Sequence, residues 1–174
     1  MFFQTRIFVA TLFLLPSLAR ADEPLSQPEK IFVCSPSGSV CANSDPTANS
    51  TTIFRKYGAK TLWSIEGWHR WLFVADDGGA IAVAYNGMNL VPPNSDLQLE
   101  VLHFYNHGKL VRSIKLADLY IDKSQLMRTV SHFAWVLSIH INRANQLVVE
   151  LVSGQRLAFD MSSGELRVQI PDDS

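Results

Sequence analysis

Apolar and polar residues alternate in short runs along most of the chain between residues 31 and 170. The stretch from Trp71 to Ile114 contains four such runs, each of about six to nine residues. Asn, Asp and Gly separate these runs at residues 76–79, 86–87 and 106–108, and these residue types favour tight reversals. An alternation with a period of two indicates strands with one buried face. The stretch therefore predicts one four-stranded antiparallel meander.

Imperfect copies of this meander lie on both sides of it. In the third copy Asn145 takes the place of the turn glycine, which suits asparagine because it enters the left-handed region at low cost. The opening segments of the three copies are Phe32–Cys41, Phe73–Ala82 and Ile139–Val148, and the later ones are Phe54–Gly58, Phe104–Gly108 and Phe159–Gly164. Because repeated matches at fixed places indicate a repeat architecture, we expect three repeats, at about 31–66, 71–116 and 135–170.

Residues 1–21 have the pattern of a signal peptide. Arg6 precedes an apolar run from Ile7 to Leu15, and Ala19 and Ala21 place small residues at a cleavage site. We expect residues 22–30 to form a flexible lead, residues 31–170 a single all-β repeat domain, and residues 171–174 a tail. The pattern predicts a periplasmic or secreted protein with no stable membrane insertion after cleavage.

Removal of the signal peptide changes the charge balance. Loss of Arg6 and Arg20 leaves thirteen Lys and Arg against sixteen Asp and Glu, a formal net charge of about −3. A negative chain is a poor non-specific ligand for phosphate backbones, so we expect no nucleic-acid partner.

The two cysteines, Cys34 and Cys41, flank one predicted turn. An oxidising compartment favours a disulfide between them. If Pro36-Ser37 forms a two-residue loop, Cys34 lies opposite Ser39 and Cys41 is a diagonal neighbour near the limit of disulfide reach. A wider loop would set the cysteines opposite each other. The alternative is two small buried apolar side chains.

Aromatic residues are densest between Trp63 and Trp71. We expect these two tryptophans to pack in the core between repeats. The intervening Trp68, His69 and Arg70 follow a glycine at a repeat junction, where exposed rings and a guanidinium could stack on a flat ligand. His132 and Trp135 open the third repeat at an equivalent place. The hypothesis is therefore one ligand or partner site built from Trp68, His69, Arg70, His132 and Trp135.

Two insertions, residues 87–96 and 117–130, interrupt the repeats. Ser124 could cap one helical turn over residues 125–128. Leu119, Tyr120, Leu126 and Met127 offer this insertion an apolar face. Long connections either carry function or cover core that would otherwise be exposed, and we expect them to cover core here.

Motifs for catalysis and cofactors are missing. The sequence has no Gly-x-Ser-x-Gly elbow, His-Glu-x-x-His pair, phosphate loop or dinucleotide fingerprint. His103 and His107 fall in a predicted strand and the following turn, so their spacing does not indicate a metal pair. We expect no cofactor and no metal.

The turns Ser-Pro-Ser-Gly and Ala-Asp-Asp-Gly, with the later segment Phe-Tyr-Asn-His-Gly-Lys-Leu, resemble the blades of exported bacterial β-propellers. The resemblance implies an all-β fold of three propeller-like four-stranded meanders, either a partial propeller or a sandwich-like roll, with at most one short helix near residues 117–130. Three blades fall short of the four to eight of closed propellers. The expected function is a non-catalytic binding or protein-interaction module with a protein or small-ligand partner. The alternative is a small hydrolase or lyase that uses His69, Arg70 and His132.

Overall fold

The structure is a computed structural model that describes residues 25–170. The predicted signal peptide and the tail at 171–174 lie outside the described residues. No helix in the described part of the chain is long and apolar enough to cross a membrane.

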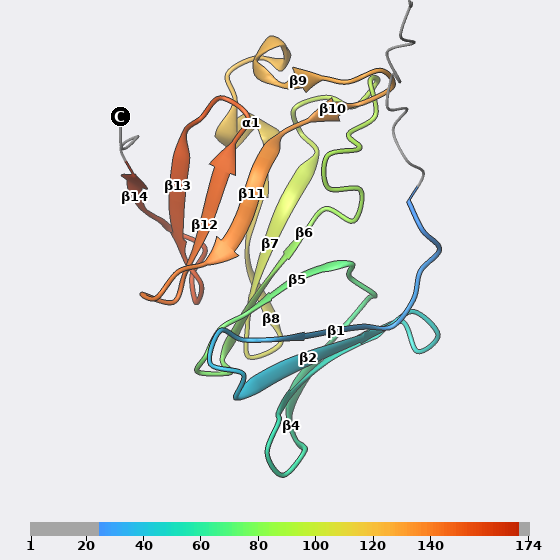
Figure 1. Ribbon diagram of the computed structural model, residues 1–174, viewed down its shortest axis with the longest axis vertical. Helices are drawn as coiled ribbons and strands as arrows, with labels where there is room; N and C mark the ends of the chain where they lie inside the picture. Colours follow the sequence, from blue (N-terminus) through green and yellow to red (C-terminus); the bar gives the residue numbers. More distant parts are fainter. Residues whose placement is uncertain (1–24, 171–174) are drawn as a thin grey trace, which may run out of the picture.

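Three four-stranded antiparallel sheets follow one another along the chain, and each is a simple meander (Figure 1). Sheet 1 consists of β1 (Ile31–Cys34), β2 (Val40–Asp45), β3 (Ser50–Arg55) and β4 (Lys60–Glu66). Sheet 2 consists of β5 (Trp71–Val74), β6 (Ala80–Ala84), β7 (Glu100–Asn106) and β8 (Lys109–Lys115). Sheet 3 consists of β11 (Val136–Ile141), β12 (Gln146–Leu151), β13 (Arg156–Asp160) and β14 (Leu166–Ile170). The predicted fold class is confirmed, and none of these sheets closes on itself.

The first hairpin of each sheet contains the same turn, with a residue in the left-handed region at its fourth position. Gly38 has a φ of 71°, Gly78 of 77° and Asn145 of 58°. The amides of these residues donate to the carbonyls of Ser35, Ala75 and Asn142. The sequence alignment, which matched Gly38 with Gly79, is therefore wrong by one residue, because Gly78 is the glycine that takes the positive φ. Asn145 does replace the turn glycine.

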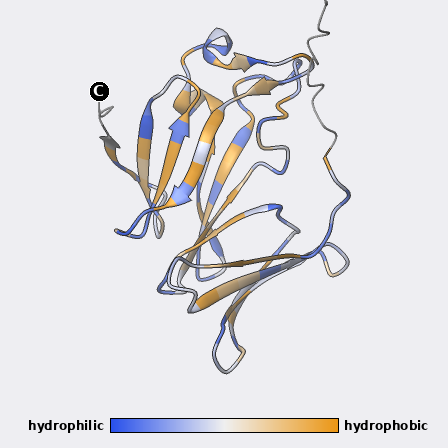
Figure 2. Ribbon diagram, in the orientation of Figure 1, coloured by the Kyte–Doolittle hydropathy of each residue, from blue (hydrophilic) through white to orange (hydrophobic). Residues whose placement is uncertain are grey.

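Sheet 2 lies between the other two sheets and has both faces covered. All five residues of β6 are buried, and they alternate between two cores. Ala80, Ala82 and Ala84 pack in the core shared with sheet 3, whereas Ile81 and Val83 pack in the core shared with sheet 1. Bands of apolar and polar residues also alternate along β7 and β11 (Figure 2). The period of two in the sequence thus distributes side chains between sheet faces.

Cys34 and Cys41 form a disulfide and are directly opposite each other in the β1–β2 ladder. The hairpin closes through a bond from the Ser35 amide to the Val40 carbonyl, 2.8 Å long. The hairpin therefore has the wider of the two predicted loops, not the two-residue loop.

Sheets 2 and 3 are joined by residues 116–134, which we call the cap. It contains α1 (Leu116–Leu119), the 3-10 turn η1 (Lys123–Gln125), and the two-stranded ladder of β9 (Met127–Arg128) and β10 (Phe133–Ala134). The prediction that Ser124 caps a turn over 125–128 is wrong. Asp122 is the capping residue, and its carboxylate accepts from the Ser124 amide at 2.5 Å.

Candidate functional site

Trp68 and Arg70, predicted to bind a ligand, contact the N-terminal lead. The Trp68 indole donates to the Glu29 carbonyl at 2.8 Å, and the Arg70 guanidinium donates to the hydroxyl and carbonyl of Ser26 at 2.7 and 2.6 Å. The guanidinium carbon lies 5.1 Å from the centre of the Trp68 ring, within cation–π range. This pair therefore holds residues 26–29 against the junction between sheets 1 and 2.

His69 lies in the same junction but faces a small cleft of about 230 Å³. Its backbone amide donates to the Ser44 hydroxyl at 2.7 Å, and its ring centre is 6.4 Å from that of Tyr105. Its Nε2 is buried without a hydrogen-bond partner. The cleft is lined by His69, Val83, Ala84, Tyr85, Asn86, Glu100, His103 and Tyr105.

Burial lowers the pKa of His69, and the nearby His103 lowers it further. Burial also lowers the pKa of His103, against the opposing effect of Glu100, whose carboxylate lies 3.7 Å from its Nδ1. The same Nδ1 is 3.0 Å from the Ser113 hydroxyl. Both imidazoles are thus kept neutral at neutral pH. No group of three or more His, Cys, Asp or Glu within residues 25–170 is arranged to hold a metal ion.

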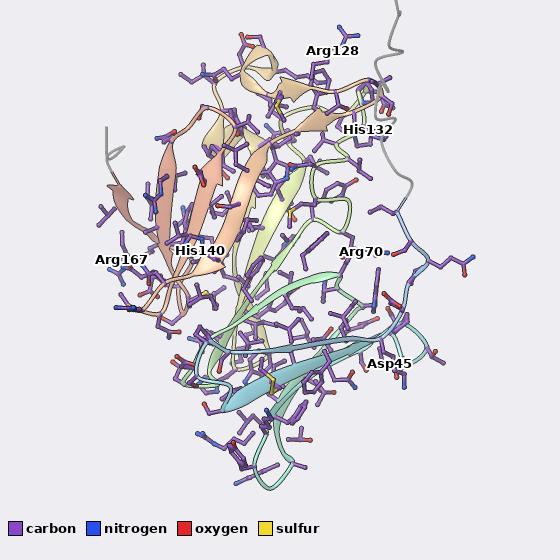
Figure 3. The ribbon with its side chains drawn as sticks, viewed as in Figure 1. Asp45, Arg70, Arg128, His132, His140 and Arg167 are labelled. Atoms are coloured by element: carbon purple, nitrogen blue, oxygen red, sulfur yellow. A yellow bond between two sulfur atoms is a disulfide. The ribbon has the colours of Figure 1, made fainter. Side chains whose placement is uncertain are left out.

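His132 lines a different cleft, of about 270 Å³, at the cap. Its Nδ1 is 2.8 Å from the Ser131 hydroxyl. Figure 3 shows His132 near Arg128 at the cap end of the molecule, while Arg70 lies beside the lead. The predicted cluster of His69, Arg70 and His132 is not assembled, because the repeat junctions that carry these residues do not meet.

Trp135 is a core residue. Its side chain is fully buried between sheets 2 and 3, and its indole donates to the Met88 carbonyl at 2.8 Å. Trp135 therefore presents no exposed ring at the repeat junction. Trp71, predicted to be in the core, is 37% exposed. Trp63 is partly buried against the core between sheets 1 and 2.

The cap carries a further cleft with a mainly apolar lining. This cleft, of about 380 Å³, is lined by Lys123, Ser124, Leu126, Arg128 and Phe133. The cap also exposes apolar side chains, with Ile121 91%, Val130 79% and Met127 49% exposed. The sequence signal is the apolar content of the insertion at residues 117–130, for which covering the core was the favoured of two roles.

The cap is held firmly on its inner side. The buried Tyr120 hydroxyl donates to the Trp135 carbonyl, and burial raises the pKa of Tyr120 to about 12. Asn89, in the other insertion, accepts from the amides of Trp135 and Val136 at 3.1 Å and donates to the Val136 carbonyl at 2.7 Å. Lys123 donates to the Pro93 and Ser95 carbonyls. Lys123 therefore joins the two insertions, and Asn89 joins the first of them to the residues that follow the cap.

No protein-family model matches the chain, and no curated protein matches it. Among solved structures, Kuenenia stuttgartiensis hydrazine synthase is similar at 16% identity with a TM-score of 0.39, over 79% of this chain and 35% of that chain. A β-propeller domain of Myceliophteria thermophila Cps50 (Swd1) is similar at 12% identity with a TM-score of 0.37, over 82% of this chain and 43% of that chain. The chain thus spans less than half the length of either structure. Both TM-scores lie below 0.5, so the fold assignment rests on the sheets themselves.

Proposed function

We propose that this chain is an exported, non-catalytic binding module that holds a protein partner on the outer surface of its cap. The observation that carries the proposal is the cleft lined by Leu126 and Phe133, in a segment of the chain that also exposes Ile121, Met127 and Val130. Contiguous exposed apolar surface with a polar rim is typical of protein-interaction sites.

The rim of the cleft indicates the chemistry of the partner. Lys123 and Arg128 border it, and no Asp or Glu is among the described residues that line this cleft or the adjacent one at His132. Lys123 lies 5.0 Å from the centre of the Phe133 ring, so a cation stands beside an apolar residue of the cleft. We therefore expect the partner to insert an apolar side chain flanked by carboxylates.

Export is supported by the predicted signal peptide and by the Cys34–Cys41 disulfide, since disulfides persist mainly in oxidising compartments. His69 and His132 line different clefts, which favours a binding module over the hydrolase or lyase alternative. The proposal therefore needs no reacting group, only the shape and charge of the cap.

Site-specific photo-cross-linking in the producing cells tests the proposal. A photoreactive residue at Val130 should form a covalent adduct with one partner, whereas the same residue at Tyr57, 82% exposed at a hairpin tip far along the chain, should form none. Arg128→Glu should reduce the yield of the Val130 adduct at least ~3-fold, because an ion pair at an interface is replaced by repulsion. Equal adducts at both positions, or none at Val130, would contradict the proposal.

A further inference from the structure

The cleft of about 230 Å³ at His69 lies between sheets 1 and 2. Val83 and Tyr105 belong to the core that sheet 2 shares with sheet 1, and His103 is directly opposite Val83 in the β6–β7 ladder. These side chains therefore lie on the face of sheet 2 that faces sheet 1, whereas His69 reaches the cleft from the junction between the two sheets. The cleft shares no lining residue with the two clefts of the cap.

Buried polar groups hold the junction at His69. The Ser44 hydroxyl accepts from the His69 amide at 2.7 Å. The Thr51 hydroxyl lies 2.9 Å from both the Ser44 hydroxyl and the Gly67 carbonyl, and Ser44 and Thr51 are both 0% exposed. An added Cβ at Gly67 would lie 3.2 Å from the His69 Nε2, so the imidazole packs against this glycine. The histidine is therefore held at the edge of the cleft by the fold itself.

The cleft carries a negative charge that no neighbouring cation neutralises. Glu100 is the one residue of its lining with a formal charge, because both histidines are kept neutral at neutral pH. Lys115 is opposite Glu100 in the β7–β8 ladder, but its ammonium donates to the Gln98 side chain at 3.0 Å. Within residues 25–170 the Glu100 carboxylate forms no ion pair with a lysine or arginine, and its near contact is the His103 Nδ1 at 3.7 Å.

Aromatic rings and an acceptor nitrogen lie beside this charge. The ring centres of His69 and Tyr105 are 6.4 Å apart, and Tyr85 lines the same cleft. The faces of aromatic rings carry negative potential and attract cations. The His103 Nδ1 lies near the Ser113 hydroxyl and the Glu100 carboxylate, which favours the proton on Nδ1. The Nε2 of a neutral imidazole protonated in this way is a hydrogen-bond acceptor.

We propose that this cleft binds a small organic cation, a primary ammonium group on a short carbon chain, with Glu100 as its counter-ion and the rings of His69 and Tyr105 beside it. An ammonium group donates three hydrogen bonds, which suits a carboxylate and a neutral imidazole together. An anion is disfavoured, because no lysine or arginine is among the described residues that line the cleft. The volume lies below the roughly 300–1,000 Å³ of pockets for drug-sized ligands, which restricts the ligand to a small molecule.

Titration of the isotope-labelled chain, purified after export, with propylammonium at neutral pH tests the proposal by NMR. Propanol and propionate are the matched probes, since they are similar in size but neutral and negative. We expect saturable shifts in the signals of His69, His103 and Val83, with a Kd of about 1–10 mM, the range open to a ligand of so few atoms. Propanol and propionate should bind at least ~10-fold more weakly, because neither forms an ion pair with Glu100.

Glu100→Gln keeps the shape of the side chain and removes its charge. It should raise the Kd for propylammonium at least ~10-fold. The matched control is Glu165→Gln, the same change at an exposed carboxylate beside β14, which should leave the Kd unchanged. Spectra of Glu100→Gln that agree with those of the wild type outside the cleft will show that the fold is retained.

Three results would overturn the proposal. Equal affinity for propanol or propionate would show that the cleft does not select a cation. The absence of saturable shifts at propylammonium concentrations far above the expected Kd would show that it binds no such ligand. Shifts that persist in Glu100→Gln, or that spread to exposed carboxylates such as Glu165, would show only non-specific ion pairing. None of these results bears on the cross-linking expected at Val130.

Discussion

Asp76 and Asn145, 69 residues apart in the chain, are joined by a hydrogen bond from the Asp76 amide to the Asn145 side-chain oxygen, 3.2 Å long. The Asp76 carboxylate in turn accepts from the Ser37 amide at 2.9 Å. These residues belong to the equivalent turns of sheets 2, 3 and 1. The three hairpin tips therefore converge on Asp76, which links all three sheets at one end.

Asp76→Ala should lower the free energy of unfolding by about 1 kcal/mol at pH 7, the net value of a typical hydrogen bond. The bonds from Ser37 lower the pKa of Asp76 below its usual 3.8. The carboxylate thus contributes stability above the unfolded pKa and loses it as the pH falls through the lower folded pKa. Urea unfolding should show the wild type and the variant converging as the pH is lowered below 3.8.

Asn145→Gly tests the other link, because glycine adopts the φ of 58° readily and lacks the side-chain acceptor. A loss similar to that of Asp76→Ala would support the convergence of the tips. No loss in either variant would show that the tips are held by packing alone.

Gly164→Ala should destabilise the fold by roughly 2–4 kcal/mol. An added Cβ would lie 2.8 Å from the Phe104 ring and 2.8 Å from the Arg112 Cβ, at a φ of 69°. Gly58→Ala is the matched control, since Gly58 has a φ of 84° with nothing within 4 Å of an added Cβ. The free energy of unfolding of this variant should fall by only about 1–2 kcal/mol, because the added Cβ strains the backbone but meets no neighbour. Thermal unfolding of both variants measures the difference, and equal losses would argue against tight packing between sheets 2 and 3.

Asn89→Ala should lower the free energy of unfolding by about 2–4 kcal/mol. The Asn89 side chain is the hydrogen-bond partner of the Trp135 and Val136 amides and of the Val136 carbonyl, and the variant leaves all three without it. Hydrogen exchange of the Trp135 indole, measured by NMR, should accelerate as the cap loosens. Asn43→Ala, on the outward face of sheet 1, is the control and should leave this exchange unchanged.

The lowered pKa of His69 predicts that the stability of the fold depends on pH. A histidine whose folded pKa is lowered binds fewer protons in the folded state than in the unfolded state. Its contribution is therefore complete above the unfolded pKa of 6.5, and stability falls as the pH drops below that value. His69→Gln should flatten the fall in melting temperature between pH 7 and pH 5. An unchanged slope in His69→Gln would assign the effect to other groups.

The fold could be predicted from the sequence because strand alternation and turn glycines are local properties. The one-residue error at Gly79 arose because Gly78 and Gly79 are adjacent, and only backbone geometry tells which one takes the positive φ. The candidate site was harder to predict from the sequence, because it depends on which repeat junctions lie close together in space. Trp135 is buried and Trp71 is partly exposed, the reverse of what we expected, because the side chain of a tryptophan at a repeat junction can point into the core or toward solvent. The bond between the Val152 amide and the Tyr120 hydroxyl joins residues far apart in the chain, and local sequence patterns do not reveal such contacts.

The burial of β6 on both faces sets a limit on how this chain can change in length. One residue inserted between Ala75 and Ala80 would reverse every side chain of the strand and drive Ile81 and Val83 into space shaped for alanine methyl groups. The hairpin tip at residues 56–59 faces solvent and can grow or shrink without such a consequence. Length variation in this protein should therefore be concentrated at its periphery and excluded from the turn that leads into its middle sheet.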